Sequence, residues 1–266
     1  MGYALPRLLI QLLTRRPYGV HSPFLFSFAE NCLYAGERHP GFELLEGIRR
    51  DLQLSDKQIL VKDFGTGGRF DAPKRDGDPI QRKKRLGSIA RSALQRPKYC
   101  RLFFRMAGYF QPATILELGT SLGISTCYLA YGAPEARLIT LEGCPQVSLV
   151  AQDVFNRAGV AHIECLTGPF HQTLPGLLDR VSNPDMVYVD GNHSYQGLME
   201  NYHILRDHMP ENGVVIIDDI RWSWGMWKAW KEIVSDPKVS LSVDLGHIGI
   251  LFFRRALSKD NIRMGF

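Results

Sequence analysis

Two neighbouring segments carry the strongest pattern in this chain: TILELGTSLGIS at residues 114–125 and RLITLE at residues 137–142. The first begins as an apolar run typical of a buried strand and continues into a turn that contains Gly119 and Gly123. A predicted helix leads to the second apolar run, which ends at an acid, Glu142. A strand, a turn, a helix and a second strand in this order predict a βαβ unit of an α/β fold.

The glycine turn and the terminal acid together predict a site for an adenosine-type cofactor. Gly119 and Gly123 lack a Cβ, so the backbone there can approach a ligand closely. The carboxylate of Glu142, at the end of the second strand, can accept hydrogen bonds from two ribose hydroxyls. A glycine turn alone is weak evidence, whereas the turn and the acid together are typical of nucleotide-type cofactor binding.

The spacing of the glycines disfavours a dinucleotide. A dinucleotide turn has the pattern G-x-G-x-x-G, whose third glycine packs the helix against the strand. In this chain Ser125 and Thr126 occupy the region of that third glycine. Glu117, two residues before the first glycine, would repel a pyrophosphate but suits a cofactor that carries positive charge. An NAD-dependent dehydrogenase is therefore the weakest interpretation.

The pattern E-x-G-x-x-x-G at residues 117–123 resembles the first motif of the class I S-adenosylmethionine-dependent methyltransferases. In that family the glycine turn contacts the amino-acid end of the cofactor and the second-strand acid binds the ribose. The family also places adenine contacts after the third strand, where this chain has Gly168 and Phe170. The resemblance implies S-adenosylmethionine as cofactor, with contacts from Glu117, Gly119, Thr120, Ser121, Gly123, Glu142, Gly168 and Phe170.

Strand-like runs alternate with helical stretches from residue 114 onward. The runs fall at residues 114–118, 137–142, 161–166, 185–190 and 213–218. This alternation predicts a parallel sheet with helices on both faces. Two further runs, 239–244 and 247–253, predict a closing antiparallel hairpin. The resemblance therefore implies the α/β, Rossmann-like seven-stranded methyltransferase sheet, with five parallel βα units and a terminal hairpin.

The first hundred residues lack this alternation. Helical patterns occur at residues 8–13, 24–33 and 42–52. A short β-type run at 59–64 ends in a second glycine turn, but prolines and glycines break the chain after it, so no second cofactor site is predicted. We expect residues 1–96 to form a mainly helical N-terminal extension or cap and residues 97–258 to form the S-adenosylmethionine-binding methyltransferase domain.

Acidic residues follow the fourth and fifth predicted strands: Asp190 after one, Asp218 and Asp219 after the other. Ligands of open α/β sheets bind beyond the carboxyl ends of the strands, so we expect these side chains to converge. Three carboxylates repel one another unless a cation neutralises them. Oxygen ligands suit Mg²⁺, Ca²⁺ or Mn²⁺. The alternative role of each aspartate is to cap the helix that follows it.

The same acids resemble the metal ligands of the catechol- and caffeoyl-coenzyme A-type O-methyltransferases. Those enzymes hold a metal with an acid after strand four and an Asp-Asn or Asp-Asp pair after strand five. The resemblance implies that Asp190, Asp218 and Asp219 hold Mg²⁺ or a similar divalent cation, and that Asp190 also contacts the cofactor. It assigns Asp190 a catalytic role as well.

A histidine takes the position of the expected general base. Three residues beyond the first metal acid, the catechol enzymes carry a lysine, whereas this chain has His193. Histidine, with an unperturbed pKa of about 6.5, suits a proton acceptor near neutral pH. We expect His193 to be catalytic as the base; a metal ligand and a hydrogen-bonding residue at a helix start are the alternatives.

The positive charge of the chain is unevenly distributed. Residues 69–105 carry twelve Lys and Arg against three Asp, a local net charge of +9 in a chain whose net charge is +5. Such a segment can attract an acidic substrate or nucleic acid. A solvated surface is the favoured interpretation, because no RNA-binding signature with interleaved aromatics accompanies it. The absence of an Asn/Asp-Pro-Pro-Tyr motif after strand four also disfavours a nucleobase amine as acceptor.

The five cysteines are scattered and form no C-x-x-C pair, so neither a zinc site nor a disulfide framework is indicated. We expect a cytoplasmic protein. The apolar stretch at residues 5–13 is too short for a membrane span and is interrupted by Arg7, so no transmembrane segment or signal peptide is predicted.

The sequence therefore predicts an S-adenosylmethionine-dependent O-methyltransferase of a small hydroxylated acceptor, aromatic ones included, assisted by a divalent metal. A methyltransferase of RNA or lipid and a non-catalytic S-adenosylmethionine-binding module are the alternatives. Trp222 and Trp224, just after the acidic pair, are candidates to wall an aromatic substrate site. The expected partner is a small molecule rather than nucleic acid, and a homodimer is compatible with the sequence.

Overall fold

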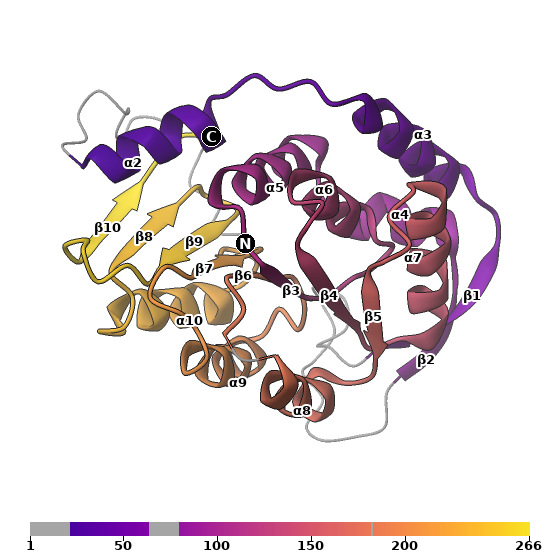
Figure 1. Cartoon of the computed structure of the whole chain (residues 1–266). Coiled ribbons are helices and arrows are strands. Elements are labelled where there is room, and N and C mark those ends of the chain that lie inside the picture. The colour runs from indigo at the N-terminus through magenta and orange to yellow at the C-terminus, as the bar shows by residue number, and fades with distance from the viewer. Residues whose placement is uncertain (1–21, 64–79, 182) are drawn as a thin grey trace. The chain divides into compact units, whose positions relative to one another are not determined.

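The computed structural model describes residues 22–63, 80–181 and 183–266 (Figure 1). The chain divides into two compact units. Unit 1 comprises Met1–Ala35 and Leu178–Phe266, and unit 2 comprises Gly36–Leu177. Among the described residues, no helix is both long enough and apolar enough to span a bilayer.

Parts of the predicted N-terminal cap lie outside the described residues. These parts are the helical pattern at residues 8–13 and the second glycine turn at residues 65–68; residues 69–79 of the basic segment also lie outside. The division of the chain at residues 96 and 97 stays a prediction.

Unit 2 contains the predicted βαβ pattern as three parallel strands. The strands β3 (Thr114–Leu118) and β4 (Arg137–Glu142) pair with each other, and β4 pairs with β5 (Glu164–Thr167). The helices between them are α6 (Ile124–Gly132) and α7 (Pro145–Arg157), and α8 (Phe170–Arg180) follows β5. The predicted bounds of β3 and β4 are confirmed. β5 begins three residues later than predicted, because residues 161 and 162 still belong to an exposed turn after α7.

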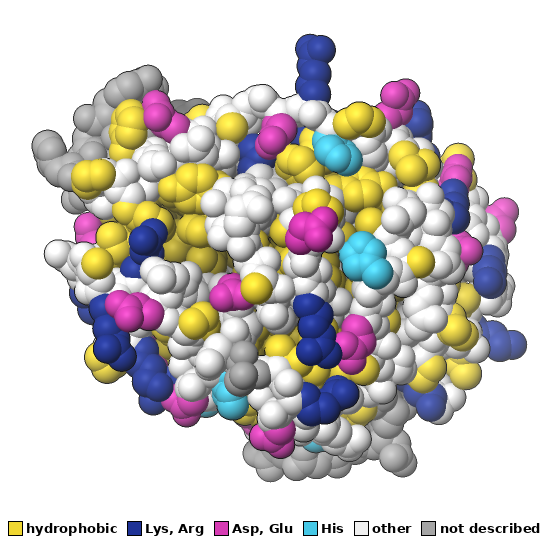
Figure 2. Space-filling view, viewed as in Figure 1, with side chains coloured by type: hydrophobic (Ala, Val, Ile, Leu, Met, Phe, Trp, Pro, Cys, Tyr) yellow, Lys and Arg dark blue, Asp and Glu magenta, His cyan; other side chains and the backbone are white. Residues whose placement is uncertain are grey.

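The N-terminal part of unit 2 is helical with one hairpin. Its helices are α3 (Pro40–Leu54), α4 (Leu86–Ala93) and α5 (Pro97–Phe110). The strands β1 (Gln58–Asp63) and β2 (Ile80–Arg85) pair antiparallel. The charged run at residues 82–85 is thus an exposed strand, which the sequence did not predict. On the face of the molecule in Figure 2, Lys and Arg side chains are interspersed with Asp and Glu and do not gather into one basic patch.

Unit 1 contains five strands in the order β10-β8-β9-β7-β6. They span β6 (Met186–Val189), β7 (Val214–Ile217), β8 (Leu241–Asp244), β9 (Gly249–Phe252) and β10 (Asp260–Arg263). β6 and β7 are parallel, while β9 runs antiparallel to both β7 and β8, which confirms the predicted hairpin. β10, parallel to β8, was not expected.

Helices flank the strands of unit 1. They are α2 (Pro23–Phe28), the π-helix η2 (Ala29–Leu33), α9 (Tyr195–Arg206) and α10 (Trp224–Ser235). The rings of Phe24 and Phe28 meet Phe252 of β9 edge-on, with centroids 5.1 and 5.4 Å away. All four residues of each of β6, β7, β8 and β9 are buried, so these strands form the centre of the unit. Aromatic packing thereby fixes α2 on β9.

The turn between β3 and α6 needs backbone conformations that favour glycine. Gly119 and Gly123 have φ angles of 107° and 81°, and Ser121 has a φ of 48°. The amides of Gly119 and Thr120 both donate to the carbonyl oxygen of Leu141 in β4, at 2.9 and 3.2 Å. The turn is therefore fixed to the end of β4 by backbone hydrogen bonds.

Gly123 also allows α6 to pack closely on α7. A Cβ at this position would lie 2.6 Å from Cε1 of Phe155 and 3.2 Å from Cβ of Ala151. Gly159, at the end of α7, has a similar φ of 72°, but a Cβ there would have no atom within 4 Å. The two glycines thus share the backbone conformation and differ in the space around them.

We expect Gly123→Ala to destabilise the protein more than Gly159→Ala. Both variants place a Cβ in the left-handed region, at a cost of roughly 1 kcal/mol, and Gly123→Ala adds overpacking of roughly 1–3 kcal/mol. Urea unfolding of the two variants beside the parent chain measures the difference. Equal losses of unfolding free energy would contradict the packing role of Gly123.

A buried carboxylate lies beneath the same turn. Glu117 of β3 has no exposed surface and accepts hydrogen bonds from three hydroxyls: Ser125 at 3.0 Å, Thr126 at 2.5 Å and Thr140 at 2.6 Å. Ser125 and Thr126 belong to α6 and Thr140 to β4, so one side chain connects three elements. Burial raises the pKa of Glu117 from 4.5 to about 7, and the hydroxyl donors oppose that shift.

This raised pKa predicts a pH dependence of stability. The folded protein holds the Glu117 proton to higher pH than the unfolded chain does, so the contribution of Glu117 to the unfolding free energy is greatest below pH 4.5 and is lost as the pH rises through about 7. The fall amounts to about 3 kcal/mol at most. Glu117→Gln, which has no proton to lose, should flatten this part of the profile.

Urea unfolding at several pH values between 4 and 8 measures the effect. The matched control is Glu135→Gln, which removes an exposed carboxylate from the turn before β4. A parent profile that Glu117→Gln leaves unchanged would show that Glu117 is not the titrating group.

Candidate functional site

The predicted cofactor residues of unit 2 meet at the end of β4. Both oxygens of the Glu142 carboxylate accept hydrogen bonds from backbone amides at 2.9 Å, Oε2 from Ser121 and Oε1 from Cys144. Burial raises the pKa of Glu142, and the backbone donors oppose this. A carboxylate has about four acceptor positions, so its oxygens can still accept from hydroxyl donors of a ligand. The glycine turn and the acid are thus one site.

Gly168, predicted to lie near the adenine, is next to Glu142. Its amide donates to the Glu142 carbonyl oxygen at 2.9 Å, and its φ of 151° follows from the sharp turn after β5. Phe170, two residues on, is half-buried at the start of α8. The structure therefore places Ser121, Glu142 and Gly168 side by side.

Two predicted cofactor residues, Thr120 and Glu117, have side chains that point into the interior of unit 2. Thr120 is fully buried, and its hydroxyl lies 2.6 Å from that of Thr140. Thr140 in turn donates to the buried carboxylate of Glu117. These side chains support the turn from below, and their contact with a cofactor stays a prediction.

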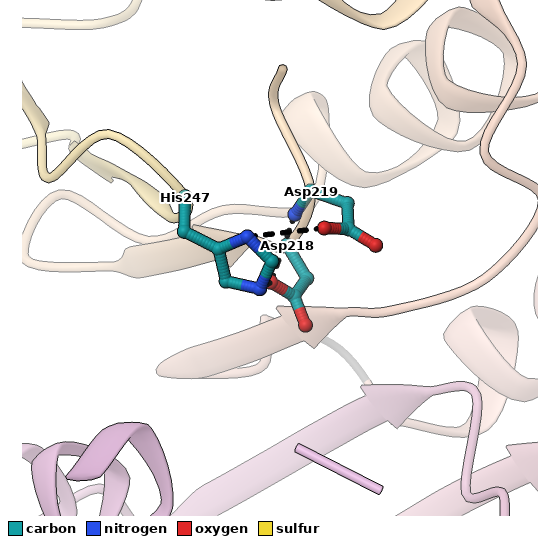
Figure 3. A group of neighbouring side chains, drawn as sticks. All are labelled: Asp218, Asp219 and His247. Carbon is teal, nitrogen blue, oxygen red and sulfur yellow. Dashed lines mark hydrogen bonds and ion pairs between the residues drawn. The ribbon is translucent and has the colours of Figure 1, made fainter. Parts of the chain in front are cut away.

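Unit 1 brings the predicted metal residues together at the carboxyl ends of β6 and β7. Asp218 and Asp219 lie next to His247, a residue of the turn between β8 and β9 (Figure 3). The Nδ1 atom of His247 is 3.1 Å from Asp219 Oδ1, and its Nε2 atom is 3.4 Å from Asp218 Oδ1. One ligand atom of each of the three residues lies within 4.8 Å of the others, close enough to hold one metal ion.

Asp190 joins this cluster through a buried tyrosine. The hydroxyl of Tyr188, a residue of β6 with no exposed surface, lies 3.0 Å from Asp190 Oδ2 and 2.9 Å from Asp218 Oδ2. One hydroxyl proton is thus shared between two carboxylates. Burial and the neighbouring Asp190 charge raise the pKa of Asp218 to about 7. The cluster is therefore short of positive charge.

His193 lies on the exposed side of the cluster. Its Nε2 atom is 3.7 Å from Asp190 Oδ1 and 3.9 Å from Asp219 Oδ2, and its ring centroid is 5.9 Å from that of Trp222. The helix-start role falls to its neighbour Ser194, whose hydroxyl caps α9 by accepting from the amide of Gly197.

The aspartates do not cap these helices either. The cap of α10 is Ser223, whose hydroxyl accepts from the amide of Met226 at 3.1 Å. With Ser194 on α9 and Ser223 on α10, the helix-capping alternative for Asp190, Asp218 and Asp219 is not observed. Asp219 itself has a φ of 53°, which is uncommon for a residue with a side chain.

Sequence reasoning missed His247. The antiparallel register pairs Ile217 of β7 with Gly249 of β9. Two residues further along, the same register sets Asp219 opposite His247, and the Ile220 amide donates to the His247 carbonyl oxygen at 3.1 Å. The available signal was that His247 comes two residues before β9, the strand that pairs with β7. This signal can be used only when the register of the two strands is known.

An ion pair fixes the turn that carries His247. The Nη1 atom of Arg221 donates to Asp244 Oδ1 at 2.6 Å and to the Gly246 carbonyl oxygen at 2.7 Å, and its Nη2 atom also donates to Asp244. Asp244 Oδ1 accepts from the Gly246 amide at 2.8 Å as well. Arg221 holds the pKa of the Asp244 carboxyl below its usual value despite burial. His247 is thus presented by a rigid turn.

Known proteins resemble this chain in both sequence and fold. A family model described as a methyltransferase domain matches residues 116–220. The catechol O-methyltransferase of Mycobacterium tuberculosis (strain ATCC 25618 / H37Rv) is 42% identical over 110 residues, which are 40% of this chain and 47% of that protein. The catechol O-methyltransferase of Niastella koreensis is 39% identical over 90 residues, 33% of this chain and 41% of that protein. The chain thus spans less than half the length of these curated relatives.

A solved structure shares the fold over most of the chain. The O-methyltransferase of Bacillus cereus in complex with SAH has a TM-score of 0.56 at 16% identity, over 91% of this chain and 99% of that one. Its likeness concerns the fold alone. The chain therefore has the Rossmann-like fold of the class I methyltransferases, matches a methyltransferase domain at residues 116–220, and is similar in sequence over 110 residues to a catechol O-methyltransferase.

Proposed function

We propose that this chain is an S-adenosylmethionine-dependent O-methyltransferase of a small hydroxylated acceptor, aromatic ones included, assisted by a divalent metal ion. The observation that carries the proposal is the Glu142 carboxylate, held at the glycine turn by the amides of Ser121 and Cys144. This site lies within the segment that matches the methyltransferase domain.

The turn fits S-adenosylmethionine by the chemistry of its donors and acceptors. When bound, S-adenosylmethionine would supply an electrophilic methyl group on a positively charged sulfur, and that sulfur would become a neutral thioether once the methyl group is transferred. Glu142 would accept hydrogen bonds from two ribose hydroxyls with its remaining lone pairs. Gly119, Ser121 and Gly123 would let the backbone approach the amino-acid end, because their positive φ angles turn the chain sharply there.

The cluster in unit 1 fits a divalent cation by the chemistry of its donor set. Carboxylate oxygens of Asp190, Asp218 and Asp219 would be the ligands of such an ion. The ion supplies Lewis acidity, which lowers the pKa of an acceptor hydroxyl and orients its oxygen. Tyr188 would keep Asp190 and Asp218 in position by hydrogen bonding to both.

His193 would accept the hydroxyl proton at Nε2. The carboxylates of Asp190 and Asp219, at 3.7 and 3.9 Å, would stabilise the imidazolium that results. The indole of Trp222, 5.9 Å from the imidazole between ring centroids, offers a flat apolar surface that suits an aromatic acceptor. This arrangement favours a phenolic hydroxyl over an aliphatic one.

The cellular compartment and the domain organisation are also part of the proposal. All five cysteines are free, and four are buried, which is compatible with a reducing cytoplasm. Residues 1–96 are proposed as the cap, residues 97–258 as the domain, and the homodimer stays a prediction.

The rival proposal is RNA or lipid as the methyl acceptor, attracted by the basic strand β2. Salt-sensitive binding to polyanions would favour it.

We expect Glu142→Gln to weaken S-adenosylmethionine binding by at least about tenfold, because the amide replaces an acceptor for the ribose hydroxyls with a donor. Calorimetric titration of the full chain measures it, with Glu135→Gln as the control that removes an exposed carboxylate. Equal affinities in all three proteins would place the cofactor elsewhere, and absence of binding to the parent chain would end the methyltransferase proposal.

His193→Asn should lower kcat for a catechol acceptor by roughly 10²–10⁴-fold while the affinity for S-adenosylmethionine stays unchanged. Transfer of labelled methyl from the cofactor to the acceptor measures the rate. His203→Asn, an exposed histidine of α9, is the matched control. If the parent chain binds the cofactor but methylates no catechol or other phenol, the aromatic acceptor is wrong, and equal rates in the parent chain and in His193→Asn would contradict the role of His193 as base.

A further inference from the structure

We infer that His247 is a nitrogen ligand of the metal ion, and that the centre at the end of β7 therefore prefers a transition-metal ion such as Co²⁺, Fe²⁺ or Zn²⁺ to Mg²⁺. The inference rests on the metal site of the proposed function and goes beyond it by assigning a ligand from the β8–β9 turn and the class of ion. Among the described residues, Asp218, Asp219 and His247 are the group placed to hold an ion.

The spacing of the ligand atoms suits one ion. His247 Nε2 and Asp218 Oδ1 are 3.4 Å apart. With metal–ligand bonds of about 2.1 Å, neighbouring ligand atoms lie about 3.0 Å apart in an octahedral site and about 3.4 Å apart in a tetrahedral one. An ion can therefore bond to both atoms without a large movement of either side chain.

The second nitrogen of the imidazole already has a partner. Nδ1 lies 3.1 Å from Asp219 Oδ1, an ion-pair contact. The two ring nitrogens of His247 therefore lie beside different carboxylates, and a carboxylate beside a ligating imidazole makes it a stronger ligand. Asp219 keeps its other oxygen, Oδ2, available for the ion.

The position of His247 is fixed before any ion binds. The Arg221–Asp244 ion pair holds the turn, and the amide of Ile220 binds the carbonyl oxygen of His247. About a third of the His247 side chain, 35%, is exposed, so an ion can reach Nε2 from solvent. The site therefore combines a preset nitrogen donor with access.

A nitrogen donor changes which ion the site favours. Mg²⁺ requires nearly octahedral oxygen coordination and keeps several of its waters, so an imidazole contributes little to its binding. Imidazole suits Zn²⁺ and Fe²⁺, and divalent affinity for nitrogen and oxygen ligands rises from Mn²⁺ through Fe²⁺ to Co²⁺. A set of aspartates alone would leave Mg²⁺ competitive, whereas His247 gives the transition metals an advantage.

The test is calorimetric titration of the full chain, without an added histidine tag, with Mg²⁺, Co²⁺ and Zn²⁺ in turn. The variants are His247→Asn, which removes the nitrogen donor, and His203→Asn, the exposed control on α9. We expect the parent chain to bind Co²⁺ and Zn²⁺ at least about tenfold more tightly than Mg²⁺. His247→Asn should lose at least about tenfold for Co²⁺ and Zn²⁺ and change little for Mg²⁺.

A second measurement detects the bond between the His247 nitrogen and the metal ion directly. Pulsed electron paramagnetic resonance of the Mn²⁺-loaded chain detects coupling to a bound ¹⁴N, which we expect in the parent and in His203→Asn but not in His247→Asn. Circular dichroism and thermal unfolding of the metal-free variants show that each one folds.

The outcomes separate this inference from the function it rests on. If Mg²⁺ binds as tightly as Co²⁺ and Zn²⁺, or if His247→Asn keeps the parent's metal affinities and its nitrogen coupling, the inference is overturned while metal-assisted methylation stands. If none of the ions binds, both the inference and the metal part of the proposed function fail. The titration with S-adenosylmethionine then decides the methyltransferase activity independently.

Discussion

The buried carboxylate of Glu117 is the interaction on which the glycine turn depends. Its three hydroxyl partners come from the first turn of α6 and from the middle of β4, so the strand, the helix and the neighbouring strand are fixed at one point. A buried charged group is costly unless its hydrogen bonds are made, and Ser125, Thr126 and Thr140 make them. The backbone above can then hold the positive φ angles that direct the Ser121 amide to Glu142.

The clustered carboxylates of unit 1 are stabilised differently from Glu117. There the carboxylates gather at the ends of two parallel strands, and the donors on hand are the hydroxyl of Tyr188, the amide of Asp219 and the two imidazoles. Burial raises the pKa of Asp218 to about 7, and the neighbouring Asp190 charge adds to this rise. The arrangement is stable in the folded chain because the strands are buried and the Arg221–Asp244 pair holds the turn opposite.

Local pattern was enough to predict β3 and β4 with their bounds and a helix between them, because apolar runs, glycines and a terminal acid are all contiguous in the sequence. The strands β2 and β10 were missed because their residues are mostly charged or polar: they are strands through pairing with β1 and β8, which no local pattern reveals. The convergence of Asp190, Asp218 and Asp219 was predicted from strand order alone. His247 required the antiparallel register of β9, which only the folded chain displays.

Strand β2 has β1 as its one neighbour among the described residues, so its other edge presents backbone groups outward. Edges of this kind invite the strands of other molecules to pair with them. Residues 82–85 place four consecutive cationic side chains along that edge, and a second copy would bring the same charges opposite them. Such a run of like charges disfavours pairing with a second copy, and this effect weakens when salt screens the charges.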